Sequence, residues 1–555
     1  MPSYVLILPI TIASLLLYSL ATTSVNWIDP SALGLASRLP LTYWVGLALL
    51  ASLWYIGRDS KRLLAISFVL LIMYLYAGPT IIRAPVWISN SFYPFGESKL
   101  VTQLGHVDYR SGVTLVSYLD WPSFLYFSSQ FSLATGIPDY FILKYFPLLL
   151  VTLYGLLLIL IQRTKLGTSM AIFSGAWLLS GFFIRQQYFG PQAIAFVLFL
   201  MGILLISWIF FDDKPHKRTL VGLFLLVFLS TTFMHPLTSL MLVVSLFAVY
   251  LTQRIFLKRT SRIALPFCLF STIAWLSYNA LFATGFFNLM VAQVIDLVTG
   301  RSSPNIYSET SRVVGSRAMQ ISNWSSWGIV GLYALVGLIS IILIFWRGRK
   351  KKGNFSKEQE YSLFNVILLI MLGLFAVTGE YGTTEAYQRA FFFGLVPLSY
   401  LCVSLLKNKS RLLAAILIMA IFLNIPAQYG SDTYRLAADT QLNGVQFLTS
   451  NAPQSFSVIG KFTLFIRYFD PLRNYTVPDI GLDYPFTSLP NSSAVDQVMN
   501  QVLSQVDYVM RSGLEDNFYV YSLGYNPLDS INLDEKCNRI YDNGQFVLYV
   551  PTNST

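Results

Sequence analysis

Cysteine, histidine and charged residues are all scarce in this chain of 555 residues. The three cysteines, Cys268, Cys402 and Cys537, lie far apart, which excludes a disulfide framework and a metal cluster built on cysteine. Only 12% of the residues are charged, whereas soluble domains carry about 25%. Hydrophobic residues make up 55%, and the mean hydropathy is +0.57. These values exclude an ordinary soluble domain and predict an α-helical polytopic membrane protein.

Apolar runs that are long enough to cross a bilayer follow one another up to about residue 427. They begin near residues 4, 41, 63, 140, 168, 191, 219, 237, 263, 326, 362, 390 and 412. We therefore expect about 13 transmembrane helices in a domain that covers residues 1–427. The first run, Tyr4 to about Ala21, has no basic residue before it and no clear cleavage site, so we expect it to be retained as a span.

Basic residues gather in six short loops that alternate with loops poor in them. Of the 38 basic residues, 21 lie in these six loops: Arg58, Lys61, Arg62, Arg163, Lys165, Lys214, Lys217, Arg218, Arg254, Lys258, Arg259, Arg262, Arg347, Arg349, Lys350, Lys351, Lys352, Lys357, Lys407, Lys409 and Arg411. Positive loops stay in the cytoplasm, so we expect a cytoplasmic N-terminus and extracytoplasmic loops at 84–139 and 286–325. Juxtamembrane clusters of this kind face anionic membrane lipids, and we expect no nucleic-acid partner despite the net charge of +11.

The stretch from Arg83 to Tyr140 concentrates ionisable groups beside the membrane. These groups belong to Glu97, Lys99, His106, Asp108, Arg110 and Asp120. A loop longer than about 15 residues within a compact protein is usually functional or disordered, and this one is too rich in aromatic residues for disorder. The alternative is an interfacial segment whose rings lie at headgroup depth.

Two further polar segments lie at predicted outer turns. The first, residues 183–192, contains Arg185 and Gln187 at a membrane boundary, where such groups are costly unless they are paired or wetted. Pro191 predicts the start of the next helix, because proline is favoured at the first helical position. The second contains His235, which titrates near neutrality and is either functional or simply solvated.

Two more outer segments carry charge. The loop 286–325 contains several ionisable residues and is long enough to act as a lid: Asp296, Arg301, Glu309, Arg312 and Arg317. Before the twelfth run, Glu385 and Arg389 are four residues apart and share one face of a helix. They either form an intrahelical ion pair, or Arg389 holds a phosphate through its fork of donors.

The polar tail, residues 428–555, is predicted to form a small extracytoplasmic α/β domain. The expected helices are Asp439–Ser450 and Ala494–Gln505, and the expected strands are Phe456–Ile459, Val506–Met510, Phe518–Tyr521 and Gln545–Val550. The sequence Asp542-Asn543-Gly544 predicts a hairpin turn. The tail has no histidine and its acids are scattered, so we expect it to position an acceptor and to take no part in bond making.

Several short motifs resemble the GT-C superfamily of integral-membrane glycosyltransferases, in its archaeal and bacterial form. They are Gly96-Glu97-Ser98, Leu104-Gly105-His106-Val107-Asp108, Tyr118 with Asp120-Trp121-Pro122, Tyr188-Phe189-Gly190-Pro191-Gln192, Gly444-Val445-Gln446-Phe447-Leu448 and Tyr541-Asp542-Asn543-Gly544. This resemblance implies inverting transfer of a sugar, at the extracytoplasmic face, from a polyprenyl-phosphate or polyprenyl-diphosphate donor to a protein, lipid or glycan acceptor. The chain departs from the family in having Glu97 where aspartate is common, and in placing the loop after the third span instead of the first.

The resemblance also implies roles for individual residues. A carboxylate of the outer loop would act as general base, with Glu97 ranked first, Asp108 second and Asp120 third. Asp120 alternatively caps the following helix. Cationic and polar side chains would hold the donor and its phosphate: Arg389, Arg185, Lys99, His106, Gln187, His235 and Glu385. No set of metal ligands is predicted, and a divalent cation (Mg or Mn) is compatible with this chemistry without being required by it.

Two alternatives belong to other functional classes. A flippase or transporter of lipid-linked saccharides would contain internal repeats and ionisable groups at mid-membrane, and we find no clear repeat. A non-catalytic scaffold that displays the C-terminal domain would give the polar outer loops no role.

Overall fold

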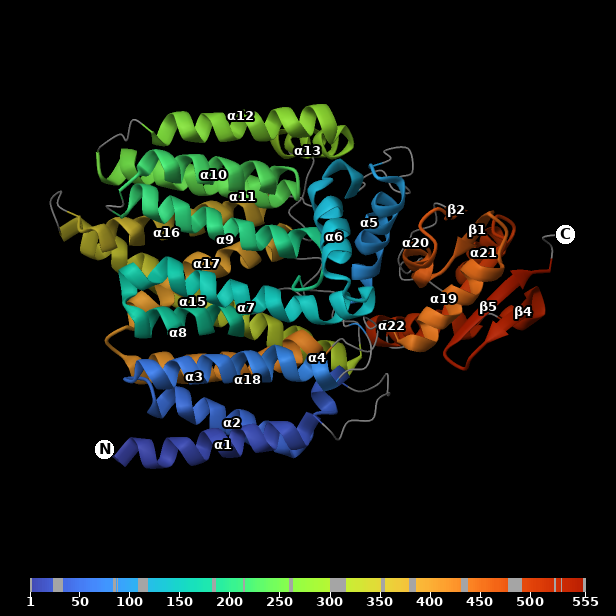
Figure 1. Ribbon diagram of the computed structural model, residues 1–555, viewed down its shortest axis with the longest axis horizontal. Coiled ribbons are helices and arrows are strands. Elements are labelled where there is room, and N and C mark those ends of the chain that lie inside the picture. Colours follow the sequence, from blue (N-terminus) through green and yellow to red (C-terminus); the bar gives the residue numbers. More distant parts are fainter. Residues whose placement is uncertain are drawn as a thin grey trace.

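The computed structural model shows a bundle of long helices with a small α/β domain at one end (Figure 1). It describes residues 2–22, 33–82, 86, 88–107, 118–181, 186–212, 215–258, 263–299, 316–350, 355–378, 386–430, 438–477, 492–523, 526–530 and 532–552. Three residues of the predicted site lie outside these ranges: Asp108, Arg185 and Glu385. So do three of the five charged residues that were singled out in the loop 286–325: Arg301, Glu309 and Arg312.

Each predicted apolar run corresponds to a helix in the described part of the chain. These helices are α1 (Pro2–Thr22), α2 (Leu41–Ile56), α3 (Lys61–Ile72) with η2 (Met73–Ala77) and α4 (Gly78–Ile82), α7 (Asp139–Leu166), α8 (Thr168–Ser180), α9 (Pro191–Phe210), α10 (Lys217–Thr232), α11 (Pro236–Leu251) with η5 (Thr252–Phe256), α12 (Ala264–Phe282), α15 (Arg317–Lys350), α16 (Lys357–Thr378), α17 (Ala386–Leu406) and α18 (Ser410–Tyr429). Among the described residues, nine segments are long and apolar enough to span a membrane. A polytopic helical fold is thus confirmed, while the total of thirteen spans stays a prediction.

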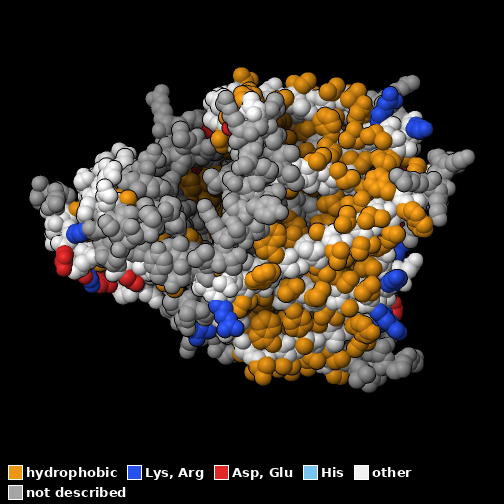
Figure 2. All heavy atoms as spheres, turned by 180° about the vertical axis from the view of Figure 1, so that it is seen from behind, with side chains coloured by type: hydrophobic (Ala, Val, Ile, Leu, Met, Phe, Trp, Pro, Cys, Tyr) orange, Lys and Arg blue, Asp and Glu red, His pale blue; other side chains and the backbone are white. Residues whose placement is uncertain are grey.

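The bundle has the dimensions of a bilayer. Figure 2 shows a broad band of hydrophobic side chains across one face of it, with Lys and Arg side chains beyond both edges of the band. On α15, Trp324 and Trp346 are 72% and 57% exposed. They are 22 positions apart, which corresponds to about 33 Å of helix, close to the hydrocarbon thickness, and tryptophan favours both interfaces. Both rings therefore lie where the boundaries of the membrane are expected.

The first two helices dock on an irregular turn of the third span. Segment η2 is a π-helix, in which the regular backbone ladder is interrupted. The hydroxyl of Tyr43, from α2, donates to the carbonyl of Tyr74, and the hydroxyl of Tyr429, from α18, donates to the carbonyl of Leu75. Tyr74 in turn donates to the carbonyl of Ser14 at 2.5 Å. These bonds satisfy backbone groups that would be costly among apolar side chains.

The predicted outer loop folds into two helices that lie across the ends of the bundle (Figure 1). These are α5 (Phe92–Leu104) and α6 (Ser123–Thr135), which end at Gly105 and Gly136 in the left-handed conformation that favours glycine. Helix α13 (Thr284–Val298) occupies the first part of the predicted lid, and α15 begins at Arg317. The described parts of that segment are therefore helical.

The α/β domain contains a five-stranded sheet of order β2-β1-β3-β5-β4. Its elements are α19 (Asp439–Asn451), β1 (Ser455–Ile459), η7 (Lys461–Phe465), α20 (Ile466–Phe469), β2 (Asn474–Thr476), α21 (Ser492–Leu503), β3 (Tyr508–Ser512), α22 (Gly513–Leu523), η8 (Pro527–Ser530), α23 (Leu533–Lys536), β4 (Cys537–Asp542) and β5 (Phe546–Pro551). Strands β2, β1 and β3 are parallel, whereas β5 pairs antiparallel with β3 and β4. An α/β domain is confirmed.

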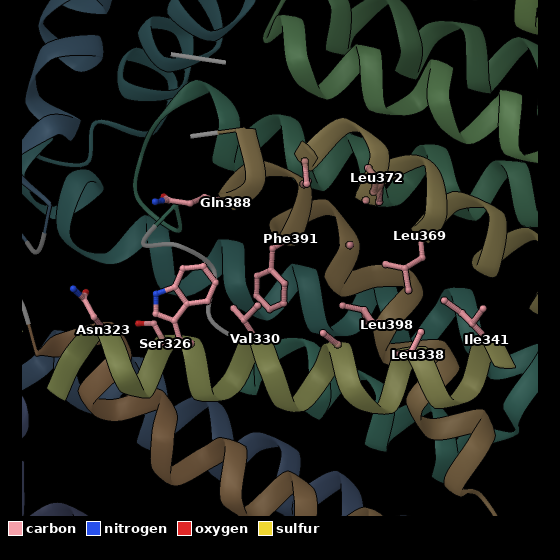
Figure 3. Close-up of a pocket in the computed structure, with 16 residues that line it drawn as sticks. Asn323, Ser326, Val330, Leu338, Ile341, Leu369, Leu372, Gln388, Phe391 and Leu398 are labelled. Carbon is pink, nitrogen blue, oxygen red and sulfur yellow. The ribbon is translucent and has the colours of Figure 1, made fainter. Parts of the chain in front are cut away.

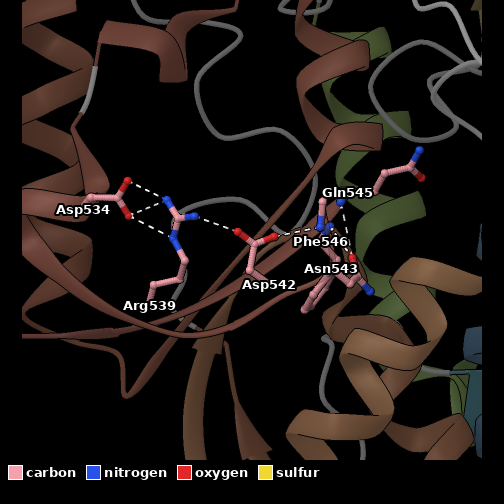
Figure 4. Close-up of polar contacts among 7 residues, drawn as sticks. Asp534, Arg539, Asp542, Asn543, Gln545 and Phe546 are labelled. Atoms are coloured by element: carbon pink, nitrogen blue, oxygen red, sulfur yellow. Dashed lines mark hydrogen bonds and ion pairs between the residues drawn. The ribbon is translucent and has the colours of Figure 1, made fainter.

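The predicted hairpin joins β4 and β5. Gly544 has φ +85°, and Asp542 accepts a hydrogen bond from its amide at 2.8 Å. Arg539 pairs with Asp534 at 2.6 Å and Asp542 at 2.7 Å, which ties α23 to the start of the turn (Figure 4). Charged side chains on β4 protect this edge of the sheet against pairing with another strand.

The strand predicted at Phe518–Tyr521 is wrong, because these residues belong to α22. Tyr519 is fully buried while its neighbours are less so. A short aromatic run with one buried member suits a helix face as well as a strand, and length alone does not separate the two.

Candidate functional site

The outer loop and the α/β domain meet at an enclosed ion pair. Glu97 of α5 is 1% exposed, and its Oε1 atom lies 3.5 Å from Nε of Arg467, whose side chain is 9% exposed. Within the described residues, neither carboxylate oxygen of Glu97 has a hydrogen-bond partner. Burial raises the pKa of Glu97, and the nearby Arg467 only partly offsets that effect. This pair is therefore loosely joined and electrostatically costly.

Close backbone contact surrounds this pair. A Cβ atom on Gly96 would lie 2.8 Å from the backbone of Arg467 and Tyr468, so α5 and α20 approach as nearly as glycine allows. Lys99 donates to the carbonyl of Tyr468 at 2.7 Å and pairs with Asp139 at 3.2 Å. The contacts of Lys99 thus hold α5, α7 and α20 together. Its predicted role in phosphate binding stays a prediction.

Arg467 was not predicted from the sequence. It lies in the tail, 370 positions after Glu97, and nothing in the sequence around either residue indicates that the two would meet. The ring of Tyr475, in β2, lies 5.9 Å from its guanidinium. Burial raises the pKa of Tyr475, and the negative charge of Glu97 adds to that shift, which places both groups around the same cation. Only the tertiary fold brings these residues together.

A second group of predicted residues gathers at the outer ends of α11 and α17. The hydroxyl of Tyr278 donates to the carbonyl of Asp120 at 2.7 Å, and the amide of Ser123 donates to the carbonyl of Phe233 at 3.2 Å. These bonds hold the Asp120 turn against the turn that leads to His235. Burial raises the pKa of the Asp120 carboxyl. The alternative role of Asp120 as a helix cap is not confirmed, because α6 has Pro122 at its N-cap and no side-chain cap bond.

His235 is buried, and the expectation that it is simply solvated is wrong. It is the N-cap of α11: its Nδ1 atom accepts from the backbone amide of Thr238 at 3.3 Å and lies 2.9 Å from the hydroxyl of that residue. Burial lowers the pKa of His235 to about 3, and the charge of Arg389 contributes to the shift. Arg389 therefore lies close enough to His235 to act on it electrostatically, although 154 residues separate them.

An aromatic contact places α9 beside α17. The rings of Phe196 and Phe392 lie 4.2 Å apart. Both helices begin at the end of the bundle nearer the α/β domain, which we call the outer end, and residues three or four positions apart share a helix face (Figure 1). One turn nearer the outer face, Gln192 on α9 and Arg389 on α17 therefore lie on the facing sides. The segment before α9 is held under the outer helices, because the ring of Phe189 packs against Phe95 and Phe124, each at 5.5 Å.

A long apolar groove runs between α15, α16 and α17 (Figure 3). Its volume is about 620 Å³, and it is lined by Asn323, Ser326, Trp327, Val330, Ala334, Leu338, Ile341, Leu369, Leu372, Gly373, Ala376, Gln388, Ala390, Phe391, Gly394 and Leu398. The polar side chains Asn323, Ser326 and Gln388 lie together at one end in Figure 3. Trp327 and Leu338 are 41% and 54% exposed, so the groove opens on the lipid-facing side of the bundle.

One further predicted residue that the structure describes, His106, joins neither group. His106 is exposed, and its Nδ1 atom lies 3.0 Å from the carbonyl of Leu104. Asp108, Arg185 and Glu385 lie outside the described residues. Within the described ranges, no three histidine, cysteine, aspartate or glutamate side chains form a metal-binding group. The divalent cation stays a prediction.

The helix arrangement, with two helices across its end and an α/β domain beyond them, is similar in fold to solved structures of an oligosaccharyltransferase. No family model matches the chain, and no curated protein matches it significantly. The likeness lies with solved structures, and it is one of fold.

Two of these structures are of the oligosaccharyltransferase of Archaeoglobus fulgidus. The complex with Zn and sulfate superposes with a TM-score of 0.53 at 12% identity, covering 88% of this chain and 74% of that one. The form tethered to an acceptor peptide with an NVT sequon gives 0.50 at 12% identity, with 90% and 75% covered. ArnT from Cupriavidus metallidurans, bound to undecaprenyl phosphate, gives only 0.40 at 14% identity, with 93% and 99% covered. The fold assignment therefore rests on the oligosaccharyltransferase.

Proposed function

We propose that this protein is a membrane glycosyltransferase that moves a sugar from a polyprenyl-phosphate or polyprenyl-diphosphate donor to an acceptor at the extracytoplasmic face. The observation that carries the proposal is the apolar groove, whose polar end includes Gln388, the neighbour of Arg389. A groove for a hydrocarbon chain that ends beside a cation suits a lipid phosphate. The fold supports the same class of function.

The groove fits an isoprenoid chain in chemistry and length. Its lining along α15 runs from Asn323 to Ile341, which corresponds to about 27 Å of helix. Gly373 and Gly394 keep the groove wide: a Cβ atom on Gly373 would meet nothing within 4 Å, and one on Gly394 would meet only Leu369 at 3.7 Å. A branched, unsaturated chain would fill this space with ordinary van der Waals contacts.

The phosphate would lie at the outer ends of α11 and α17. Arg389 offers a planar fork of donors to phosphate oxygens, and the N-terminal ends of both helices favour an anion. His235 supplies no positive charge there, because its pKa is lowered to about 3 by burial and by Arg389. Its ring is instead available as a neutral polar group. Arg185 and Glu385 remain predicted contacts of the same phosphate.

Asp120 is the described carboxylate best placed to act as general base. It is joined through Ser123 and Phe233 to the turn of His235, and it is more exposed than Glu97. In the proposed step it takes the proton of the acceptor nucleophile, which forms a bond to the anomeric carbon as the bond to the phosphate oxygen breaks. The polyprenyl phosphate leaves with those electrons, and a single displacement inverts the anomeric centre. A catalytic role for Glu97 or Asp108 stays a prediction.

The α/β domain would position the acceptor. Its helix α20 packs on α5, and α22 contacts α15, the helix that carries the polar end of the groove. The domain thus contacts both α5 and the helix that lines the proposed donor groove. The oligosaccharyltransferase of the same fold was solved with a tethered acceptor peptide, and a protein acceptor would enter from this side.

The groove is tested by the substitution Gly373→Leu. The new side chain would project into the groove and meet no protein atom, so we expect loss of donor binding with the fold retained. Gly222→Leu is the matched control, since a Cβ on Gly222, on α10, also meets nothing within 4 Å and lies outside the groove. Binding of polyprenyl phosphate and transfer from a lipid-linked sugar are measured for both. Equal activity in the two variants would refute the groove as the donor site.

The flippase alternative predicts a different result. Purified protein in liposomes would move lipid-linked sugar between leaflets and would release no transferred product. The transferase proposal expects product without translocation.

A further inference from the structure

Two buried carboxamides near the start of α9 have no hydrogen-bond partner. Gln187 is 1% exposed and Gln192 is 4% exposed, and within the described chain neither the nitrogen nor the oxygen of either amide is bonded. Nearly all buried polar groups in folded proteins are hydrogen-bonded, because burial without a partner costs free energy. Among the described residues, these four hydrogen-bonding atoms are therefore left open to a ligand that offers both donors and acceptors.

The two amides lie beside the proposed phosphate site. Gln192 belongs to the first turn of α9, one turn above the contact between Phe196 and Phe392. Arg389 lies one turn above the same contact on α17. Gln187 belongs to the segment that Phe189 anchors beneath α5 and α6. Gln192 thus lies beside the point at which a phosphate held by Arg389 would carry its sugar, and Gln187 lies five residues earlier on the segment beneath α5 and α6.

We propose that Gln187 and Gln192 bind hydroxyl groups of the sugar that the lipid donor carries. The inference rests on the proposed function and adds the sugar subsite to it. A carboxamide donates through nitrogen and accepts through oxygen, which suits vicinal hydroxyls, each of which also donates and accepts. Both amides are neutral and do not compete with Arg389 for the phosphate. The class of ligand is therefore a polyhydroxylated sugar ring.

A ligand site and a structural role predict opposite effects on stability. If the amides supported the fold, an apolar replacement of similar size would destabilise it. If they are held without partners for a ligand, the same replacement removes a cost and leaves the melting temperature unchanged or raised, because an unsatisfied buried group is lost. Binding of the sugar then suffers while the fold does not.

The experiment uses Gln192→Leu and Gln187→Leu, with Gln162→Leu as matched control. Gln162, on α7, is fully buried and also lacks partners on both amide atoms within the described residues, but it lies near the opposite end of the bundle. For each variant of the full chain we would measure the melting temperature, the Kd for polyprenyl phosphate and the Kd for polyprenyl phosphate that carries a hexose. The bare lipid phosphate reports on the groove and Arg389 alone.

We expect Gln192→Leu and Gln187→Leu to weaken binding of the hexose-bearing lipid by about 10- to 100-fold, with the bare lipid bound as before. Gln162→Leu should change neither affinity. Equal loss for both lipids, or a melting temperature lowered only in the Gln187 and Gln192 variants, would overturn the sugar subsite. Parent protein that binds neither lipid would instead overturn the proposed function itself, so the two failures are distinguishable.

Discussion

Two ion pairs with little exposed side-chain surface, one at each end of the bundle, are built in opposite ways. At the inner end, Lys165 bonds directly to Asp212 and to the carbonyl of Phe211 at 3.1 Å, and its ammonium lies 5.6 Å from the ring centre of Tyr361. At the outer end, Glu97 and Arg467 approach to only 3.5 Å, without a hydrogen bond between them. The inner pair joins neighbouring helices, whereas the outer pair joins two domains.

The difference indicates how strongly each ion pair fixes the elements that it joins. A cation with several close partners fixes the helices that carry it, because separating them strands a buried charge. A loose pair at a domain boundary loses less on separation. We therefore infer that the inner pair fixes its helices, while close packing of α20 on α5 and the contacts of Lys99 contribute more than the pair of Glu97 and Arg467 to holding the α/β domain. The predictions below test this contrast, from the largest expected effect on the outer site to the smallest.

The largest effect is expected for Asp120→Asn. The amide keeps the size of the side chain and removes the base, which typically costs about 10²- to 10⁴-fold in kcat. The pKa of Asp120 is raised by burial, and a base acts only when deprotonated, so activity of the parent should fall as pH drops through that raised value. Transfer rates are measured across pH.

Asp296→Asn is the control for this substitution, since Asp296 lies on the outer helix α13 away from the described site. It should keep the activity and pH profile of the parent. If Asp120→Asn also kept them, the general base would have to be sought at Glu97 or Asp108.

Arg467→Met should weaken the docking of the α/β domain by about 1–3 kcal/mol at neutral pH, since it leaves Glu97 buried without its cation. The folded-state pKa of Glu97 is already raised and should rise further. Stability from such a carboxyl is present below its unfolded pKa and is lost as pH rises through the folded value, so docking should recover in acid. Hydrogen exchange of α20 amides measures this.

The double variant with Glu97→Gln is the control. Because it carries no ionisable group at the contact, its exchange should not depend on pH over this range. A pH dependence that persists in the double variant would assign the effect to another group.

Gly96→Ala tests the closeness of the same contact. The added methyl group would lie 2.8 Å from backbone atoms of Arg467 and Tyr468, which cannot rotate away, and overpacking of this kind costs about 1–3 kcal/mol. We expect faster proteolytic release of the α/β domain, with the helical bundle unchanged. Gly222→Ala, on an open helix surface, should release nothing.

Lys165→Met is expected to have the smallest effect on the outer site. It strands Asp212 and should lower the melting temperature, yet kcat and KM of transfer in the folded fraction should not change measurably. A shift in donor KM would show that the two ends of the bundle are coupled, and would contradict the expectation that the inner pair acts only on stability.

The sequence predicted those features that depend on local pattern. Each apolar run became a helix, because twenty apolar residues must satisfy their own backbone groups within lipid. In the tail, Asp542-Asn543-Gly544 predicted its hairpin, since glycine tolerates the positive φ of the turn. The short strands β2 and β4 were missed, because three residues are too few to reveal an alternating pattern in β2, and charged residues interrupt it in β4.

The site was predicted only in part, since its residues meet through tertiary contacts. Asp120, His235 and Arg389 were each selected for their position at an outer turn, but nothing local indicated that they would converge. The enclosure of Glu97 had no local sign either, because it depends on Arg467 in another domain. Gln192 belongs to the motif Tyr188-Phe189-Gly190-Pro191-Gln192, but no role was predicted for it. Its position at the start of an apolar span, where an amide is costly without a partner, was the signal that could have indicated a binding role.

The sideways opening of the groove has a consequence for how the donor is encountered. A lipid that enters between α15 and α16 diffuses within one leaflet and never leaves the bilayer, so its effective concentration is its mole fraction among the other lipids. Diluting the donor with inert phospholipid at constant bulk concentration would then slow the reaction, whereas adding more buffer would not. The rate of transfer would then depend on the mole fraction of donor in the membrane, and not on its concentration in the bulk solution.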